Sequence, residues 1–65
     1  MTVNSLARVE PTGEDDPIAL EWRGRIVILD RKRELGDFPV GGLWRVRDQE
    51  TGMVATFREK DLVPL

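Results

Sequence analysis

Apolar and polar residues alternate with a period of two soon after the N-terminal quarter of the chain. Between residues 17 and 23 every second side chain is large and apolar, and residues 26–29 form a continuous apolar run. A period of two is typical of a half-buried strand, so we predict one long strand over residues 17–29. Gly24 interrupts it and is expected to mark a bulge or bend that lets the strand curl.

The C-terminal third of the chain has the pattern of a β-hairpin. Residues 43–47 alternate again, residues 48–52 are polar and contain a glycine, and residues 53–57 return as a partner strand. A polar helical turn over residues 58–61 and a short last strand over 62–65 complete the pattern. About five short β elements without a helical period predict an all-β fold.

Two segments carry turn residues and charges instead of a period. Residues 1–16 contain Pro, Gly and an acidic cluster, and we expect a disordered acidic arm there, followed by one folded domain over residues 17–65. Residues 30–42 combine five consecutive charged side chains with glycines and a proline. This stretch is predicted to be a long loop, a common place for function.

The hairpin half resembles the distal half of SH3 domains. Trp44, Thr51-Gly52, Phe57 and Leu62-Val63-Pro64 follow the spacing of its hairpin, short 3₁₀ turn and last strand. The resemblance implies an SH3-like five-stranded small barrel. In eukaryotic SH3 domains an aromatic groove binds proline-rich peptides, but here Leu43 holds the place of the groove tryptophan and the chain has no tyrosine, so that motif is not retained.

A second resemblance is to type II, plasmid-borne dihydrofolate reductase, which is also an SH3-like barrel. Residues 22–27 are similar to its Trp-x-Gly-x-Ile-Val strand, and residues 53–57 fall where that family carries Ser-Val-Gln-Ile-Tyr. The resemblance implies an oligomer that binds nicotinamide cofactor and folate in a central pore. Ala55 stands where the family has its ligand-binding glutamine, so this motif is not retained either.

Composition narrows the classes of function. The chain has 65 residues, a net charge of −2 and no His or Cys, so we expect no catalytic residues, no metal site and no cofactor. No apolar run approaches the ~20 residues of a membrane span, and we expect a cytoplasmic protein without a membrane partner. A chain of this size buries a small core, which favours self-association.

Two groups of residues are candidates for binding. Arginines 23, 25, 45 and 47 would form a positive patch for nucleic acid if the two segments converge, as in many SH3-like bacterial modules. The apolar tip of the long loop and the strand after it favour a protein partner or a second copy of the chain. The predicted partner-binding residues are Phe38, Val40, Leu43, Trp44, Arg31 and Arg33.

We therefore predict a non-catalytic SH3-like interaction module that binds a protein partner or itself. The first alternative is a nucleic-acid-binding small barrel that uses an arginine face. The second is an oligomeric nicotinamide- or folate-binding protein related to type II dihydrofolate reductase.

Overall fold

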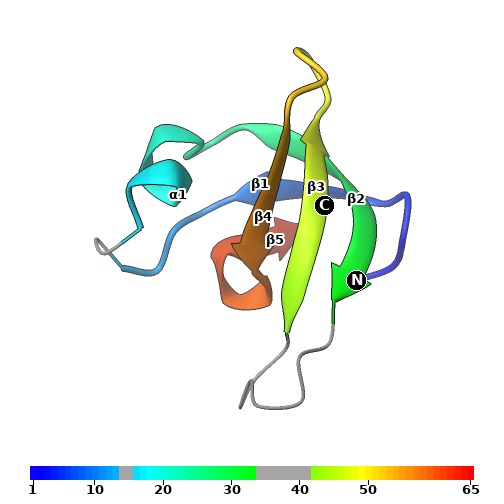
Figure 1. Cartoon of the computed structure of the whole chain (residues 1–65), viewed down its shortest axis with the longest axis horizontal. Helices are drawn as coiled ribbons and strands as arrows, with labels where there is room; N and C mark the ends of the chain where they lie inside the picture. Colours follow the sequence, from blue (N-terminus) through cyan, green and yellow to red (C-terminus); the bar gives the residue numbers. More distant parts are fainter. Residues whose placement is uncertain (14–15, 34–41) are drawn as a thin grey trace.

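Five antiparallel strands form a single curled sheet with one short helix beside it (Figure 1). The structure is a computed structural model and describes residues 1–13, 16–33 and 42–65. The elements are β1 (Leu6–Val9), α1 (Pro17–Glu21), β2 (Ile26–Arg33), β3 (Leu43–Asp48), β4 (Val54–Arg58), the 3₁₀ turn η1 (Glu59–Asp61) and β5 (Leu62–Pro64). The strand order in the sheet is β4-β3-β2-β1-β5. The predicted all-β, small barrel-like fold is confirmed.

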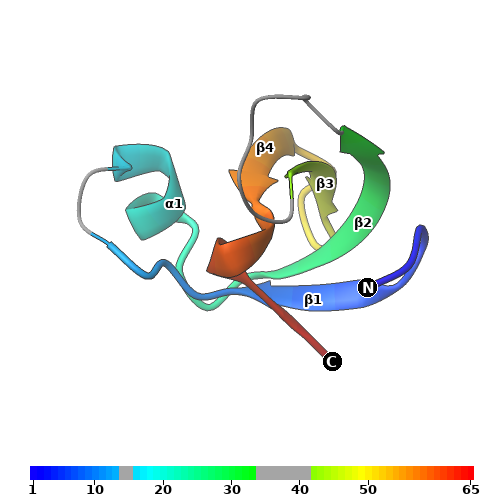
Figure 2. The same cartoon turned by 90° about the horizontal axis from the view of Figure 1, so that it is seen from below.

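Strand β2 curls the sheet because it belongs to two strand pairs. Its first residues, 26–28, pair with β1, whereas residues 27–33 pair with β3. The register shifts between Leu29 and Arg31, which is a bulge, and Figure 2 shows how strongly the strand bends. The predicted loop over residues 30–42 is therefore wrong at its start, because residues 30–33 continue the strand. Their charged side chains are compatible with a strand because they are exposed to solvent.

The hairpin and the last two elements agree with the sequence pattern. Strands β3 and β4 pair from Leu43 with Arg58 to Arg47 with Val54. Gly52 closes the turn with a φ of 78°, a left-handed conformation in which a Cβ atom would be strained. The polar turn and last strand predicted after the hairpin are η1 and β5, so these three predictions are confirmed.

Residues 17–23 do not form the predicted strand; they contain helix α1. The Asp16 side chain accepts hydrogen bonds from the backbone N–H groups of Ile18 and Ala19, and Pro17 occupies the first turn. Such a cap and an N-terminal proline favour a helix start. Ala19 is buried while Ile18 is 54% exposed. The alternation of apolar side chains in this segment therefore does not correspond to the buried face of a strand. Gly24, with a φ of 82°, lies in the turn after the helix and not in a bulge.

The N-terminal segment is part of the fold. Strand β1 lies between β2 and β5, and Ala7 and Val9 are fully buried. Farther along, the Thr12 N–H and hydroxyl groups both donate to Asp61 Oδ1 at 3.0 Å. Strand β1 therefore contradicts the predicted disordered arm over residues 1–16 and the predicted domain boundary at residue 17. Two inward side chains on a four-residue strand are too few to give a recognisable period.

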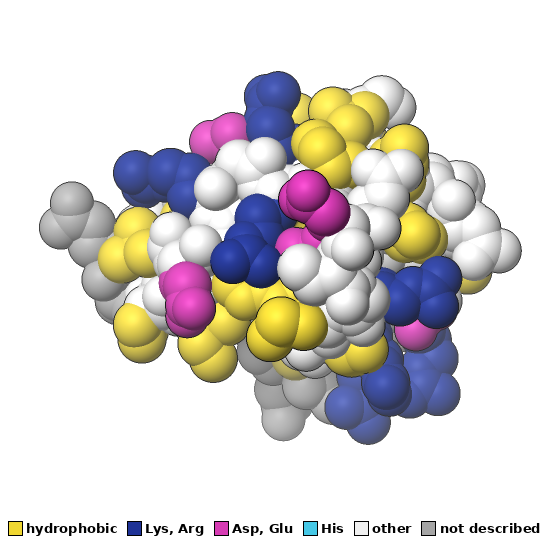
Figure 3. All heavy atoms as spheres, turned by 90° about the horizontal axis from the view of Figure 1, so that it is seen from above, with side chains coloured by type: hydrophobic (Ala, Val, Ile, Leu, Met, Phe, Trp, Pro, Cys, Tyr) yellow, Lys and Arg dark blue, Asp and Glu magenta, His cyan; other side chains and the backbone are white. Residues whose placement is uncertain are grey.

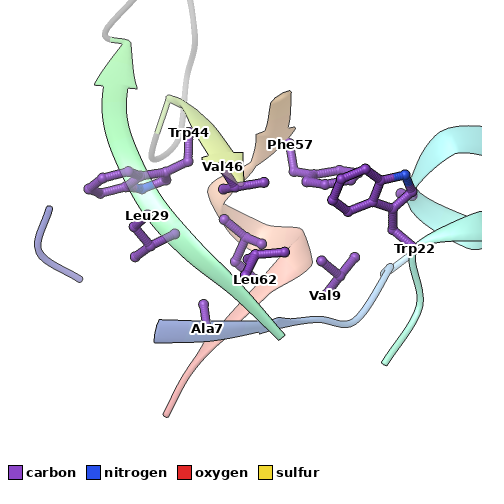
Figure 4. Packing of buried hydrophobic residues seen from close by; sticks show 10 residues of the cluster. Ala7, Val9, Trp22, Leu29, Trp44, Val46, Phe57 and Leu62 are labelled. Carbon is purple, nitrogen blue, oxygen red and sulfur yellow. The ribbon is translucent and has the colours of Figure 1, made fainter. Parts of the chain in front are cut away.

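The hydrophobic core lies inside the curl of the sheet and reaches the helix (Figure 4). The Trp22 and Phe57 rings meet edge to face, with centroids 5.5 Å apart and an interplanar angle of 62°. This contact joins the turn after α1 to β4. The buried hydrophobic residues are Ala7, Val9, Ala19, Trp22, Val27, Leu29, Trp44, Val46, Phe57 and Leu62.

Candidate binding face

Arginine side chains gather on the outer face of strands β2, β3 and β4. Residues directly opposite in an antiparallel ladder point to the same side of the sheet. The register aligns Arg31 with Arg45 and Thr56, and in the next row it aligns Arg33 with Leu43 and Arg58. A third row contains Ile28, Arg47 and Val54. We call this surface the arginine face; its arginines are Arg31, Arg33, Arg45, Arg47 and Arg58, and all five are exposed.

Like charges lie close together on the arginine face. Arg31 and Arg45 are directly opposite each other, a placement of like charges that opposes folding. Within residues 1–13, 16–33 and 42–65, none of the five guanidinium groups forms a salt bridge. The face holds half of the ten Lys and Arg residues of the chain. It is therefore a local positive field on a protein whose net charge is −2.

Three acidic residues close in sequence to these arginines have other partners. Glu59 accepts a hydrogen bond from Trp44 Nε1 at 3.3 Å, and its second oxygen lies 3.9 Å from Lys32 Nζ. Asp61 is buried and accepts the bonds from Thr12. Both carboxylates therefore have partners within the fold.

Asp48 is the third acidic residue that is held by the fold. It is 4% exposed, and its Oδ1 accepts the Glu50 and Thr51 backbone N–H groups at 2.7 and 3.0 Å. Its Oδ2 lies 3.1 Å from Arg25 Nη1. The Thr51 and Glu50 N–H groups, together with Arg25, hold the pKa of Asp48 below its ordinary value. Asp48 thus fixes the hairpin turn.

Arg23 and Arg25 do not join the arginine face. Arg25 stacks over the Trp22 ring, 5.2 Å from its centroid, and binds Asp48. Side chains alternate along β3, and Asp48 has the buried phase, so Arg25 lies on the side of β3 opposite to Arg45. Arg23 and Arg25 line a hollow of about 760 Å³ beside the hairpin turn. In Figure 3, which looks down on this end of the molecule, basic and acidic side chains lie next to each other near the centre.

The predicted partner-binding residues are not all on one surface. Trp44 is only 2% exposed and belongs to the core, so its side chain is unavailable as a surface contact. Leu43 is half-buried and lies on the arginine face between Arg33 and Arg58. Phe38 and Val40 lie outside the described residues. Of the predicted contacts, the structure thus brings Leu43, Arg31 and Arg33 together.

Sequence reasoning missed Arg58 as a member of the face. The sequence pattern predicts the start of a polar turn at this position, whereas Arg58 ends β4 opposite Leu43. Counting the hairpin register outward from the turn at residues 48–52 would have placed Arg58 opposite Leu43, a predicted partner-binding residue, because a fixed turn sets the partner of each residue.

No helix among the described residues has the length and the apolar character needed to cross a membrane. No protein-family model, curated protein or solved structure matches this chain. Its own fold and surface therefore define its class: a small all-β protein with a barrel-like sheet and a concentrated arginine face.

Proposed function

We propose that this chain is a non-catalytic interaction module that binds an acidic protein partner through the arginine face. The observation that carries the proposal is the direct opposition of Arg31 and Arg45 without a carboxylate partner among the described residues. Like charges in a sheet oppose folding, and an anionic partner removes that cost. The absence of His and Cys from the chain supports a binding role over a catalytic one.

Two observations favour a protein partner over nucleic acid. Aliphatic side chains lie beside the arginines: Leu43 lies between two of them in one row, and Ile28 and Val54 flank Arg47 in another. Such neighbouring charged and apolar groups are typical of protein interfaces. Within the described part of the chain, both tryptophans and Phe57 are buried and cannot stack on bases. The experiment must therefore distinguish a protein partner from nucleic acid, which is the alternative.

The test compares two variants with the same change in charge. Arg45→Glu alters the arginine face, and Arg23→Glu alters an exposed arginine outside it. Binding of fluorescently labelled poly-L-glutamate and of a labelled DNA duplex is measured by anisotropy at two salt concentrations. We expect Arg45→Glu to weaken poly-L-glutamate binding about tenfold, or ~1.4 kcal/mol, and Arg23→Glu to change it by less than about twofold.

Three results would contradict the proposal. Equal losses in both variants would mean that only net charge matters. No binding of either polymer at low salt would remove the arginine face as a binding site. Tighter binding of the duplex than of poly-L-glutamate, with a steep salt dependence that Arg45→Glu reduces, would assign the face to nucleic acid instead.

A further inference from the structure

Strand β4 is an edge of the sheet, and two hydrogen bonds fix which of its backbone groups point outward. The Asp48 N–H donates to the Met53 carbonyl at 2.8 Å, and the Glu59 N–H donates to the Gly42 carbonyl at 3.2 Å. Hydrogen-bonded pairs alternate along an antiparallel ladder, so residues 55 and 57 bond β3. The N–H and C=O groups of residues 54, 56 and 58 consequently point away from β3.

These outward groups have no backbone partner among the described residues. The side chains of Val54, Thr56 and Arg58 are exposed; β3 pairs with one side of β4, and α1 lies farther off on the other side (Figure 1). Unpaired groups along an exposed edge are a template for another strand. The β4 edge is therefore able to accept an extended segment.

The opposite edge, β5, is protected against such pairing. The Glu10 N–H donates to the Asp61 carbonyl and the Leu65 N–H to the Leu6 carbonyl, so the outward positions of β5 are residues 62 and 64. The Leu62 N–H is already bonded to the Glu59 carbonyl, and Pro64 has no N–H. Strand β5 thus offers no outward donor, so among the described residues β4 is the sheet edge whose outward N–H groups lack a backbone partner.

The surroundings of β4 define the chemistry of the segment. A strand added there would place every second side chain on the outer face, in line with Val54, Thr56 and Arg58 and next to the arginine face. Carboxylates at these positions complement the arginines. The intervening side chains would lie beside the partly buried Ala55, where aliphatic groups fit.

We propose that an extended segment of a protein partner, with acidic and aliphatic residues in alternation, binds β4 as a sixth strand. This inference rests on the proposed function and adds its mode of binding. Main-chain hydrogen bonds to residues 54, 56 and 58 supply the register, and the carboxylates on the arginine face supply the specificity.

The experiment uses two labelled eight-residue peptides of equal composition, one alternating Glu and Val and one with the Glu and Val residues in two blocks. Only the alternating peptide can place all carboxylates on one face of a strand. We expect the full-length chain to bind it at least about tenfold more tightly than the block peptide. Amide hydrogen exchange at residues 54, 56 and 58 should slow when it binds, since exchange requires a free N–H.

Thr56→Pro and Thr56→Val separate backbone pairing from charge. Proline removes the outward N–H and leaves the bonds of β4 to β3, whereas valine keeps the N–H and the β-branched shape. We expect Thr56→Pro to weaken the alternating peptide about tenfold and Thr56→Val to change it by less than about twofold. Circular dichroism and tryptophan fluorescence check that both variants fold.

The outcomes distinguish the two proposals. Equal binding of both peptides, or an unchanged affinity in Thr56→Pro, with a loss in Arg45→Glu, would overturn strand addition and keep the arginine face as a binding site. No binding of either peptide by a chain that still binds poly-L-glutamate would overturn strand addition alone, whereas no binding of the peptides or of poly-L-glutamate would overturn both proposals. If Thr56→Pro does not fold, hydrogen exchange in the unmodified chain decides, because unchanged exchange at residues 54, 56 and 58 in the bound state rules out strand addition.

Discussion

Two regions of the molecule, the hairpin turn and the arginine face, use arginine in different ways. At the hairpin turn, Arg25 binds the buried Asp48 and covers the Trp22 ring, so its charge and its planar face both have partners. On the arginine face, Arg31 and Arg45 are opposite each other, and neither has a salt bridge within the described residues. An arginine with partners stabilises the fold, whereas one without partners is available to a ligand. The contrast separates paired from unpaired arginines within the described part of one small protein.

The largest expected effect is a loss of stability on truncating Trp22, the ring that Arg25 covers near the hairpin turn. Trp22 is 4% exposed and contacts Phe57, so Trp22→Ala should lower the free energy of unfolding by about 3–5 kcal/mol. Ile18→Ala is the matched control on α1, since Ile18 is 54% exposed and its loss should cost less than about 0.5 kcal/mol. Urea unfolding followed by circular dichroism measures both. Similar values for the two variants would mean that the end formed by α1 contributes little to the core.

Replacing one arginine in each region should change the free energy of unfolding by a smaller amount, and in opposite directions. Arg25→Gln removes an ion pair and a cation–π contact from a side chain that is 38% exposed, and should lower the free energy of unfolding by about 1 kcal/mol. Arg45→Gln removes a like-charge opposition and should raise it by about 0.2–0.5 kcal/mol. Both are measured in urea at low salt, and added salt should shrink the gain in Arg45→Gln. A loss of stability in Arg45→Gln would show that this guanidinium has a structural partner.

The smallest effect is confined to acidic pH and concerns the hairpin turn alone. The pKa of Asp48 is lowered in the folded state, so its contribution to stability is fully present above the ordinary pKa of 3.8 and is lost as the pH falls through the lower, folded value. Unfolding measured between pH 6 and pH 2 should show this loss, and Asp48→Asn should remove that part of the pH dependence. An identical pH dependence in both proteins would exclude Asp48 as its source.

Several elements could be predicted from sequence because local physics fixes them. The hairpin follows from two alternating runs around a turn with Thr51 and Gly52, and η1 follows from a polar stretch before the last strand. Helix α1 could not be predicted from its periodicity, because five residues are too few to separate a period of 3.6 from one of two. The cap at Asp16 and the proline after it were the available signal.

The candidate site also has features that the sequence predicts and features that it does not. The arginines of the predicted loop and strand were visible as charges, but whether they converge depends on register. Strand β1 escaped prediction because its partners, β2 and β5, are distant in sequence and its burial comes from pairing with both. Trp44 had the pattern of either a core or a contact residue, and only its 2% exposure decides.

The sequence by itself determined an all-β chain, its hairpin and its lack of His and Cys, since alternation and turn residues act over a few neighbouring positions. Only the tertiary structure decided which of the described charged side chains have partners inside the fold. The bulge after Leu29 sets the pairing of Arg31 with Arg45, and burial gives Glu59, Asp61 and Asp48 partners inside the fold. Long-range register and burial are properties of strand pairing, which a single stretch of sequence does not contain.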